Sequence, residues 1–434
     1  MAQTIDLLSA QITFLVSQVM TWTCHADTVQ PSVLTLVHIP SEYYHFFLQP
    51  ILRLLFERST VDPAVWTENH DFINLSITPM GCSLMCSRTL VDQFLRPLAE
   101  QFNSLTQSSI SKLKNESIDV SKEDYVVIQV DGQGLDAGQR VLDLTGPLAM
   151  AGISIFFITT YFSDYVLVPA KARHTVVTTL QQRGFVFSPE AEAYVSQLSP
   201  ILQQHSSSAY LDRPHTSSSS GSEQFRPTSS SSAPTTPPAR DIPELQVRTF
   251  TKLIQNNIKP AVDRNLRLVS CASSREASDW EVADLKEDIT QILLATNLTK
   301  SDSGDGDLST TFMSLTLTGS EPPSLLLEER LMPLLSSTAT LLASRSEEDI
   351  LTPIVLDLQS LGWNATGIVG GVAGQLSQHI FSYELSEEAP EQAQPVEVSF
   401  LSSAKAGSII VQASQLDRAL NALQIGMENL RREK

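Results

Sequence analysis

The residues best suited to chemistry in this chain form no recognised catalytic arrangement. The glycine run from Gly367 to Gly374 differs from the GxGxxG pattern that holds nucleotide phosphates, and no Gly-Lys-Ser/Thr occurs. The acidic stretch from Asp302 to Asp307 suggests calcium, but it lacks the terminal glutamate of a calcium-binding loop. No nucleophile elbow or metalloprotease motif is present. We therefore expect no enzymatic activity, no cofactor and no metal.

Two further groups of residues have structural interpretations that compete with functional ones. Cys82 and Cys86 are spaced so that they share one face of a predicted strand, and no matching ligand pair accompanies them, so packing is favoured over metal binding. The run from Gly367 to Gly374 suits either close helix packing or approach of the backbone to a ligand. Both interpretations of the glycines stay open from the sequence.

Composition excludes several classes of protein. The 434 residues carry a net charge of -19 and no basic cluster, which argues against nucleic-acid binding. Residues 7–23 are apolar, but no basic residue precedes them and polar residues interrupt them, so neither a signal peptide nor a membrane helix is expected. Residues 1–31 are predicted as an N-terminal strand with an irregular extension. Four scattered cysteines favour a reducing compartment, the cytosol.

The elements around residues 152–168 indicate the fold. Apolar and β-branched residues on both sides of a polar break predict a hairpin there. A strand at 124–130 and a helix at 139–150 precede it, and a helix at 171–183 and a strand at 185–187 follow it. This order is that of the ferredoxin-like βαββαβ unit, which ACT ligand-binding domains use.

Similar patterns recur along the chain and predict an α+β protein of four tandem ferredoxin-like ACT domains. The predicted domains are residues 32–115, 123–190, 263–345 and 351–430. Residues 204–240 are rich in serine and proline and should form a disordered linker between two halves.

Short stretches in the second and fourth units correspond to those of a known family. They are residues 152–155, 159–164 and 165–168 in the second unit and residues 362–369 and 402–411 in the fourth. With four paired units around a variable linker, the chain resembles the CASTOR family of cytosolic arginine sensors over nearly its whole length.

The resemblance implies an amino acid bound between the second and fourth units. The matching positions are Ser154, Ile155, Gly362, Asn364, Thr366, Gly367, Ile368, Ser403, Ala404 and Gly407. However, Ala365 and Gly407 stand where the family carries acidic residues for the guanidinium group, and Lys405 is close in sequence. A buried guanidinium without carboxylates is unfavourable, so we expect a smaller or less basic amino acid than arginine.

The resemblance also implies a protein partner of the GATOR type, upstream of TORC nutrient signalling. Its contact positions correspond to Tyr161, Phe162 and Asp164, and we expect neither Phe162 nor Asp164 to be fully buried. The resulting prediction is a non-enzymatic amino-acid sensor, without nucleic-acid or membrane partners, for which a homodimer is allowed. Two alternatives remain: a structural adaptor without a ligand, and an allosteric ACT regulatory subunit of an amino-acid biosynthetic enzyme.

Overall fold

The computed structural model describes residues 19–22, 33–56, 70–108, 117–131, 137–188, 239–274, 277, 279–298, 312–335, 341–343, 349–384 and 398–432. The predicted extension 1–31 lies outside these ranges apart from one strand. The predicted linker 204–240 lies outside them apart from residues 239 and 240, and so does the whole acidic stretch 302–307.

Four stretches of the chain each contain a strand, a helix and a hairpin, and we call them units 1 to 4. Unit 1 consists of β2 (Leu34–Ile39), α2 (Tyr44–Phe56), β3 (Phe72–Thr78), β4 (Gly81–Ser87), α3 (Arg88–Phe94), α4 (Arg96–Ser108) and β5 (Asp119–Val120). Unit 2 consists of β6 (Tyr125–Asp131), α5 (Ala137–Met150), β7 (Phe156–Thr159), β8 (Asp164–Pro169), the 3-10 helix η2 (Ala170–Ala172), α6 (Arg173–Gln181) and β9 (Val186–Phe187).

The second half of the chain repeats this order. Unit 3 consists of β11 (Leu268–Ser273), α10 (Asp279–Leu298), β12 (Met313–Thr318), β13 (Ser324–Glu328), η3 (Glu329–Leu334) and β14 (Leu341–Ala343). Unit 4 consists of β15 (Leu351–Asp357), α11 (Ile368–Glu384), β16 (Val398–Ser402), β17 (Ala406–Gln412), η5 (Ala413–Gln415) and α12 (Leu416–Arg432). Three elements stand before the units: β1 (Val19–Trp22) before unit 1, and α9 (Ile242–Gln255) and β10 (Pro260–Val262) before unit 3. The predicted hairpin in each unit is confirmed.

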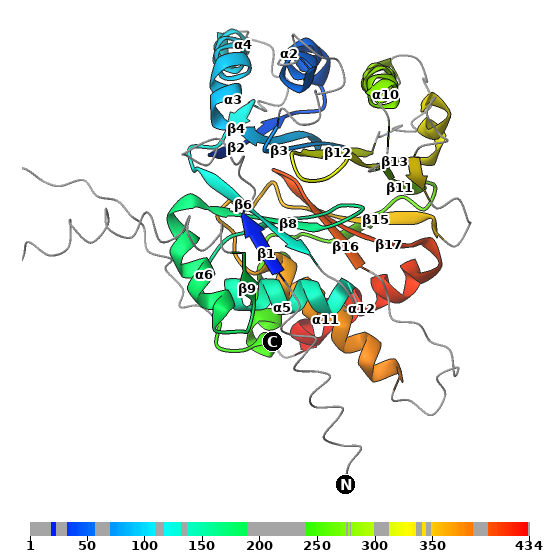
Figure 1. Ribbon diagram of the computed structural model, residues 1–434. Helices are drawn as coiled ribbons and strands as arrows, with labels where there is room; N and C mark the ends of the chain where they lie inside the picture. The colour runs from blue at the N-terminus through cyan, green and yellow to red at the C-terminus, as the bar shows by residue number, and fades with distance from the viewer. Residues whose placement is uncertain are drawn as a thin grey trace, which may run out of the picture.

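The strands of the four units join into one barrel-like sheet, where the sequence predicted four tandem domains. Its order is β2, β4, β3, β12, β13, β11, β15, β17, β16, β7, β8 and β6, which returns to β2. The barrel is flattened into two layers (Figure 1), with α2, α4 and α10 above one layer and α5, α6, α11 and α12 below the other. The protein is therefore a mixed α/β structure in which the units share one sheet.

Strand β2 shows how alternation builds this arrangement. Leu34 and Leu36 belong to an apolar cluster between the two sheet layers, which includes residues from all four units. Val37 and Ile39 point the other way and belong to the cluster beneath α2, α4 and α10. A third cluster fills the space between the other layer and its helices. The layer between the sheets thus holds both halves of the chain together.

Two short strands, β1 and β10, pair with units that come later in the chain than the units they directly precede. Strand β1 lies between β6 and β9 of unit 2, antiparallel to β6 and parallel to β9. Strand β10 pairs antiparallel with β15 of unit 4. The predicted units 123–190 and 351–430 each receive a strand from upstream in the chain, which the sequence analysis did not anticipate. Such strands of three or four residues carry little pattern of their own.

The two halves of the molecule repeat the same contacts. The Ala170 amide donates to the Asp124 carbonyl at 2.8 Å, and the Ala413 amide donates to the Ile350 carbonyl at 2.8 Å. Where β7 meets β16, the Phe157 amide donates to Ser402 Oγ at 3.0 Å. The reciprocal bond runs from the Phe400 amide to Thr159 Oγ1 at 3.1 Å. Units 1 and 2 are thus related to units 3 and 4 by an approximate two-fold symmetry.

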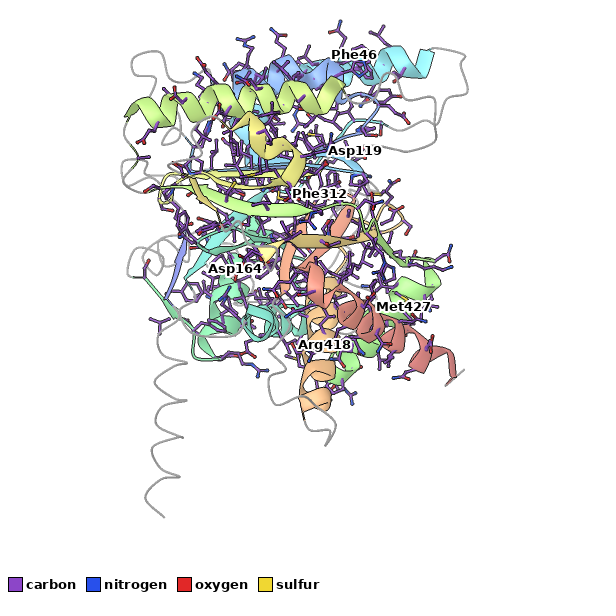
Figure 2. All side chains as sticks on the ribbon, turned by 90° about the vertical axis from the view of Figure 1, so that its right-hand side faces the viewer. Phe46, Asp119, Asp164, Phe312, Arg418 and Met427 are labelled. Atoms are coloured by element: carbon purple, nitrogen blue, oxygen red, sulfur yellow. The ribbon has the colours of Figure 1, made fainter. Side chains whose placement is uncertain are left out.

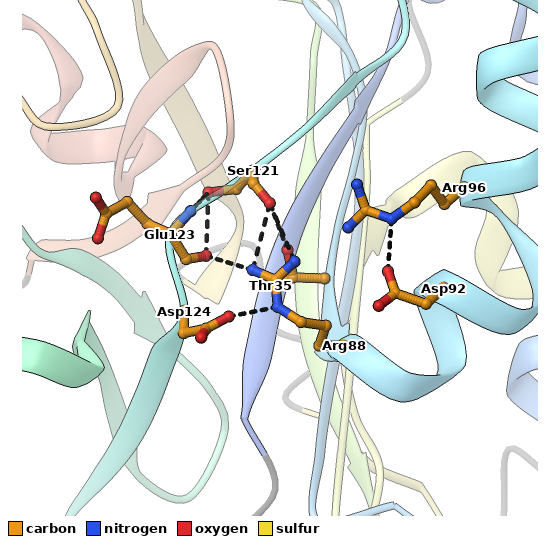
Figure 3. Close-up of polar contacts among 7 residues, drawn as sticks. All are labelled: Thr35, Arg88, Asp92, Arg96, Ser121, Glu123 and Asp124. Atoms are coloured by element: carbon orange, nitrogen blue, oxygen red, sulfur yellow. Dashed lines mark hydrogen bonds and ion pairs between the residues drawn. The ribbon is translucent and has the colours of Figure 1, made fainter. Parts of the chain in front are cut away.

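Arg88 fixes the connection between units 1 and 2 (Figure 3). Its side chain donates to the Glu123 carbonyl at 2.7 Å and to the Ser121 carbonyl at 3.3 Å, and it pairs with Asp124. Thr35 of β2 donates to the same Ser121 carbonyl at 3.2 Å. These bonds satisfy the carbonyls of the connecting segment and set the position at which β6 starts.

The glycines of α11 have the packing role that the sequence left open. A Cβ atom on Gly371 would lie 2.2 Å from Thr249 Oγ1, and one on Gly374 would lie 2.7 Å from Gln246 Nε2. Both neighbours belong to α9, so the absence of side chains lets the two helices approach closely. None of the helices in the described ranges combines the length and apolarity needed to cross a lipid bilayer.

Candidate functional site

A pocket of about 60 Å³ lies where unit 2 meets unit 4. Unit 2 contributes Ile155 and Phe156, at the start of β7. The remaining lining residues come from the β15–α11 loop, the first turn of α11 and the β16–β17 hairpin: Leu358, Leu361, Gly362, Trp363, Ala365, Ile368, Val369, Ser402, Ser403, Ala404, Ala406 and Gly407. The pocket is therefore an interface site, built by two units that are distant in sequence.

The structure brings together part of the predicted ligand site. The predicted positions that line the pocket are Ile155, Gly362, Ile368, Ser403, Ala404 and Gly407. Four other predicted positions, Ser154, Asn364, Thr366 and Gly367, are neighbours in sequence that do not line it. Gly367 instead adopts a positive φ of 83° before α11, and its carbonyl accepts a bond from Thr249 at 2.9 Å. Whether these residues bind a ligand stays a prediction.

The polar groups of the pocket wall are largely used to hold its shape. Ser402 Oγ accepts the Phe157 amide, and Ser403 Oγ accepts the Ala406 amide at 3.1 Å. The first turn of α11 differs, because the leading amides of a helix have no partner within that helix. Ile368 and Val369, in that turn, line the pocket. The positive end of the helix dipole at this turn favours a carboxylate in the pocket.

Sequence reasoning missed Trp363 and Phe156, which give the pocket an aromatic surface. A signal for Trp363 was its place beside Gly362, in the loop just before a helix. Trp363 also lies under the Lys405 ammonium, 5.8 Å from the ring centroid. Lys405 pairs at 3.0 Å with Asp119, which belongs to unit 1. The charge of Lys405 is therefore compensated from outside the pocket.

The predicted partner residues separate into two environments. Tyr161 is 40% exposed, and its ring packs edge-on against Phe162 at 5.1 Å. Asp164 is only 1% exposed and accepts a bond from Arg140 Nε at 2.7 Å. Figure 2 shows Asp164 between the two layers of helices, whereas Phe46 lies in the layer that contains α2. The expectation that Asp164 is not fully buried is wrong.

Electrostatics at Asp164 follow from this burial. Removal from water raises the pKa of the Asp164 carboxyl above its usual range, and the Arg140 guanidinium opposes that shift. The short sequence pattern around Asp164 could not reveal this, because Arg140 belongs to a different element. Asp164 is thus an internal structural acid, and the exposed surface at this hairpin belongs to Tyr161 and its neighbour.

No group of three or more His, Cys, Asp or Glu side chains in the described part of the chain could hold a metal ion. Cys82 and Cys86 are both buried in the apolar cluster beneath α2 and α4. Burial raises the pKa of the Cys82 thiol to about 12, so this thiol stays protonated and weakly reactive. The packing interpretation of these cysteines is confirmed.

Comparison with known proteins identifies one domain. Residues 120–182 match the ACT domain family. An aspartate kinase from Synechocystis aligns with 11% identity and a TM-score of 0.28, over 95% of this chain and 55% of its own. A Vibrio cholerae protein of unknown function aligns with 12% identity and a TM-score of 0.23, over 41% of this chain and 98% of its own. A search of curated proteins found no match.

Of these findings, the family match bears on unit 2, and the structural matches add nothing to it. TM-scores this low support no argument, and the chain spans about half the length of the aspartate kinase. These comparisons do not confirm the resemblance to the CASTOR family, which stays a prediction. The family match coincides with unit 2, whose topology the sequence predicted. Residues 120–182, which match the ACT domain family, contribute Ile155 and Phe156 to the pocket.

Proposed function

We propose that the protein is a non-enzymatic regulator that responds to a small amino acid bound between its ACT domain and unit 4. The observation that carries this proposal is the pocket itself, which Ile155 and Phe156 of the ACT domain share with unit 4. A ligand that contacts both units stabilises their contact only as far as it binds the closed arrangement more tightly than an open one. The response would therefore be a change in how firmly the two halves pack.

The pocket's size and lining limit the ligand. At roughly 10–15 Å³ per water, about 60 Å³ corresponds to a few water molecules, which suits a small amino acid. Phe156, Leu358 and Trp363 offer apolar surface for a short side chain, and the first turn of α11 suits the ligand carboxylate. No aspartate or glutamate is among the lining residues. A guanidinium would therefore lack a carboxylate partner, which disfavours arginine.

Isothermal titration calorimetry with each of the twenty common amino acids tests the proposal. We expect binding of at least one small amino acid and loss of that binding in Gly407→Val, whose side chain would enter the pocket. The control is Ala261→Val, an exposed position on β10 in the same sheet layer. If none of the twenty binds at millimolar concentration, the alternative of a structural adaptor without a ligand takes the place of this proposal.

The acidic residues of the CASTOR pattern provide a second test. The double variant Ala365→Glu, Gly407→Asp adds two carboxylates to the pocket wall and should bind arginine at least tenfold more tightly than the unmodified chain does. Lys405 should not neutralise them, because it already pairs with Asp119. Calorimetry with arginine, and with citrulline as the uncharged control, measures the difference. Tight arginine binding to the unmodified protein would show that the pocket is misassigned.

The finer role that we propose is nutrient sensing in the cytosol, through a GATOR-type partner upstream of TORC. It is supported by the family resemblance and by the exposed Tyr161 ring packed on Phe162. Replacing both aromatic residues by alanine should weaken capture of such a partner without unfolding the protein. Phe46→Ala is the matched control, since Phe46 is 59% exposed on another face. Equal capture by both variants would show that this surface does not bind the partner. Capture of a biosynthetic enzyme would favour the regulatory-subunit alternative.

A further inference from the structure

The β7–β8 hairpin of unit 2 and the β16–β17 hairpin of unit 4 are equivalent in the approximate two-fold symmetry. In unit 2, Thr160 Oγ1 lies 3.2 Å from the Ser163 amide and 2.8 Å from the Ser163 carbonyl. In unit 4, Ser403 Oγ makes the same pair of bonds to Ala406, at 3.1 and 3.2 Å. The two turns also dock alike, because the Tyr161 amide donates to Ser324 Oγ and the Ala404 amide donates to Ser83 Oγ.

The strand registers extend this equivalence to the position that follows each turn. Asp164 lies opposite Val130, the last residue but one of β6. Gly407 lies opposite Leu356, the last residue but one of β15. Asp164 and Gly407 are therefore the same position in the two halves. Gly407 lines the open pocket, whereas Asp164 carries a buried carboxylate.

A second equivalence concerns the helix that follows the first strand of each unit. In unit 4, Ile368 and Val369 of the first turn of α11 line the pocket beside Gly407. In unit 2, Arg140 stands in the first turn of α5 and reaches Asp164 with its guanidinium. The corresponding space in the ACT domain is thus occupied by a side chain of the chain itself.

We propose that Asp164 is the anchor of a guanidinium-binding site in the ACT domain, and that the protein fills this site with its own Arg140. The Arg140 Nε group donates to Asp164 Oδ2 at 2.7 Å, and the Arg140 side chain is 15% exposed. The Arg140 bond goes to Oδ2, and among the described residues Asp164 Oδ1 meets no donor at full hydrogen-bond geometry, with Thr159 as a further polar group beside this carboxyl. A free guanidinium could engage both oxygens at once, the arrangement in which it binds a carboxylate best.

The position of the strand that carries Asp164 does not depend on Arg140, because bonds on the opposite face of the sheet hold it. Glu321, from the β12–β13 hairpin of unit 3, accepts bonds from Ser163 Oγ at 2.6 Å and from the Tyr165 hydroxyl at 2.8 Å. Gln129 of β6 donates to the same carboxylate at 3.0 Å. These bonds hold both neighbours of Asp164 in place. Shortening Arg140 should therefore open the site and leave its shape intact.

The test is rescue of Arg140→Ala by ethylguanidinium, which replaces the lost part of the side chain. Truncation leaves the Asp164 carboxylate buried and unpaired, so the melting temperature should fall on the order of 10 °C. Ethylguanidinium at ~20 mM should restore a large part of that loss, because it binds only the folded state. Methylammonium, a cation without the planar fork, should restore much less. The wild-type protein should show no stabilisation by either compound.

The control is the double variant Arg140→Ala, Asp164→Asn, in which no buried charge is left to pair. It should melt higher than Arg140→Ala and should not respond to ethylguanidinium. Equal effects of ethylguanidinium on the single and double variants, or no effect on either, would overturn the proposal. If Arg140→Ala is not folded when purified, refolding with and without ethylguanidinium replaces melting. Recovery only with the compound supports the site, and any other result contradicts it.

This inference rests on the internal symmetry and does not require the pocket of unit 4 to bind an amino acid. The two experiments use different proteins and different probes. Failure of the amino-acid panel on the wild type would leave the rescue of Arg140→Ala unaffected, and the reverse also holds.

Discussion

His38 is a buried histidine beside the ion pair of Lys405 and Asp119, and it should make the protein sensitive to acid. Burial, strengthened by the Lys405 charge and opposed by Asp119, lowers the pKa of His38 from 6.5 to about 4. Between pH 6.5 and about 4, His38 therefore binds a proton in the unfolded chain and stays neutral in the folded protein. Stability is present above pH 6.5 and is lost as the pH falls toward 4.

The expected size of this effect follows from the pKa difference. Between pH 6.5 and pH 5, His38 should reduce the free energy of unfolding by about 2 kcal/mol. Urea denaturation at both pH values measures the loss in the free energy of unfolding. In the His38→Gln variant this loss should be smaller by the contribution of His38. His174→Gln is the control, because His174 is exposed. An identical loss in the His38 variant and the wild type would contradict the assignment.

Residue environments were the least predictable part of the site from sequence. Gly407 and Ala404, which the sequence analysis assigned to a ligand site, line the pocket, since the β16–β17 hairpin forms part of its wall. Asp164 was assigned to the partner surface because the family resemblance implies a contact position there. Its real environment depends on Arg140, which a helix and a hairpin separate from it. Spacing within one strand carries no information about such a contact.

At the scale of elements, patterns of apolar residues identified the hairpins well but not α9. This helix starts with a clear signal, because Asp241 accepts the Glu244 amide at 2.8 Å and Glu244 accepts the Arg240 amide at 2.8 Å. The signal was missed because it directly follows the serine- and proline-rich stretch. The strands β1 and β10 had no comparable signal, since they are defined by the strands they pair with.

The contact of α9 with α11 gives a prediction about packing. Gly371→Ala would place a Cβ atom 2.2 Å from Thr249 Oγ1 and 2.5 Å from Thr249 Cβ. The helices must then separate, and we expect a loss of about 2 kcal/mol in the free energy of unfolding. Gly407→Ala is the matched control, because its nearest contact would be an ordinary 3.5 Å from Leu358. The denaturation midpoints of the two variants measure the difference. Equal stability would show that α9 can shift with little loss in the free energy of unfolding.

At the scale of the whole molecule, the apolar cluster between the sheet layers takes residues from both halves of the chain. Strand β3 of the first half pairs with β12 of the second from Phe72 to Ile77. We therefore expect that residues 1–220 and 221–434, produced as separate chains, are poorly folded alone and assemble one to one when combined. Light scattering after gel filtration measures the assembly, with the uncut chain as reference. Two stable monomers that do not associate would contradict it.

The difference between Gly407 and Asp164 also decides the form of the dose response. A symmetric pair of sites could communicate, so that the first ligand favours or hinders the second and the response becomes sigmoidal. In this pair of equivalent positions one forms a pocket and the other is filled by Arg140, so the pair offers one site to a ligand. Occupancy of one independent site rises hyperbolically with ligand concentration. Any sharp threshold in the output must then come from the partner or from contacts between copies of the chain.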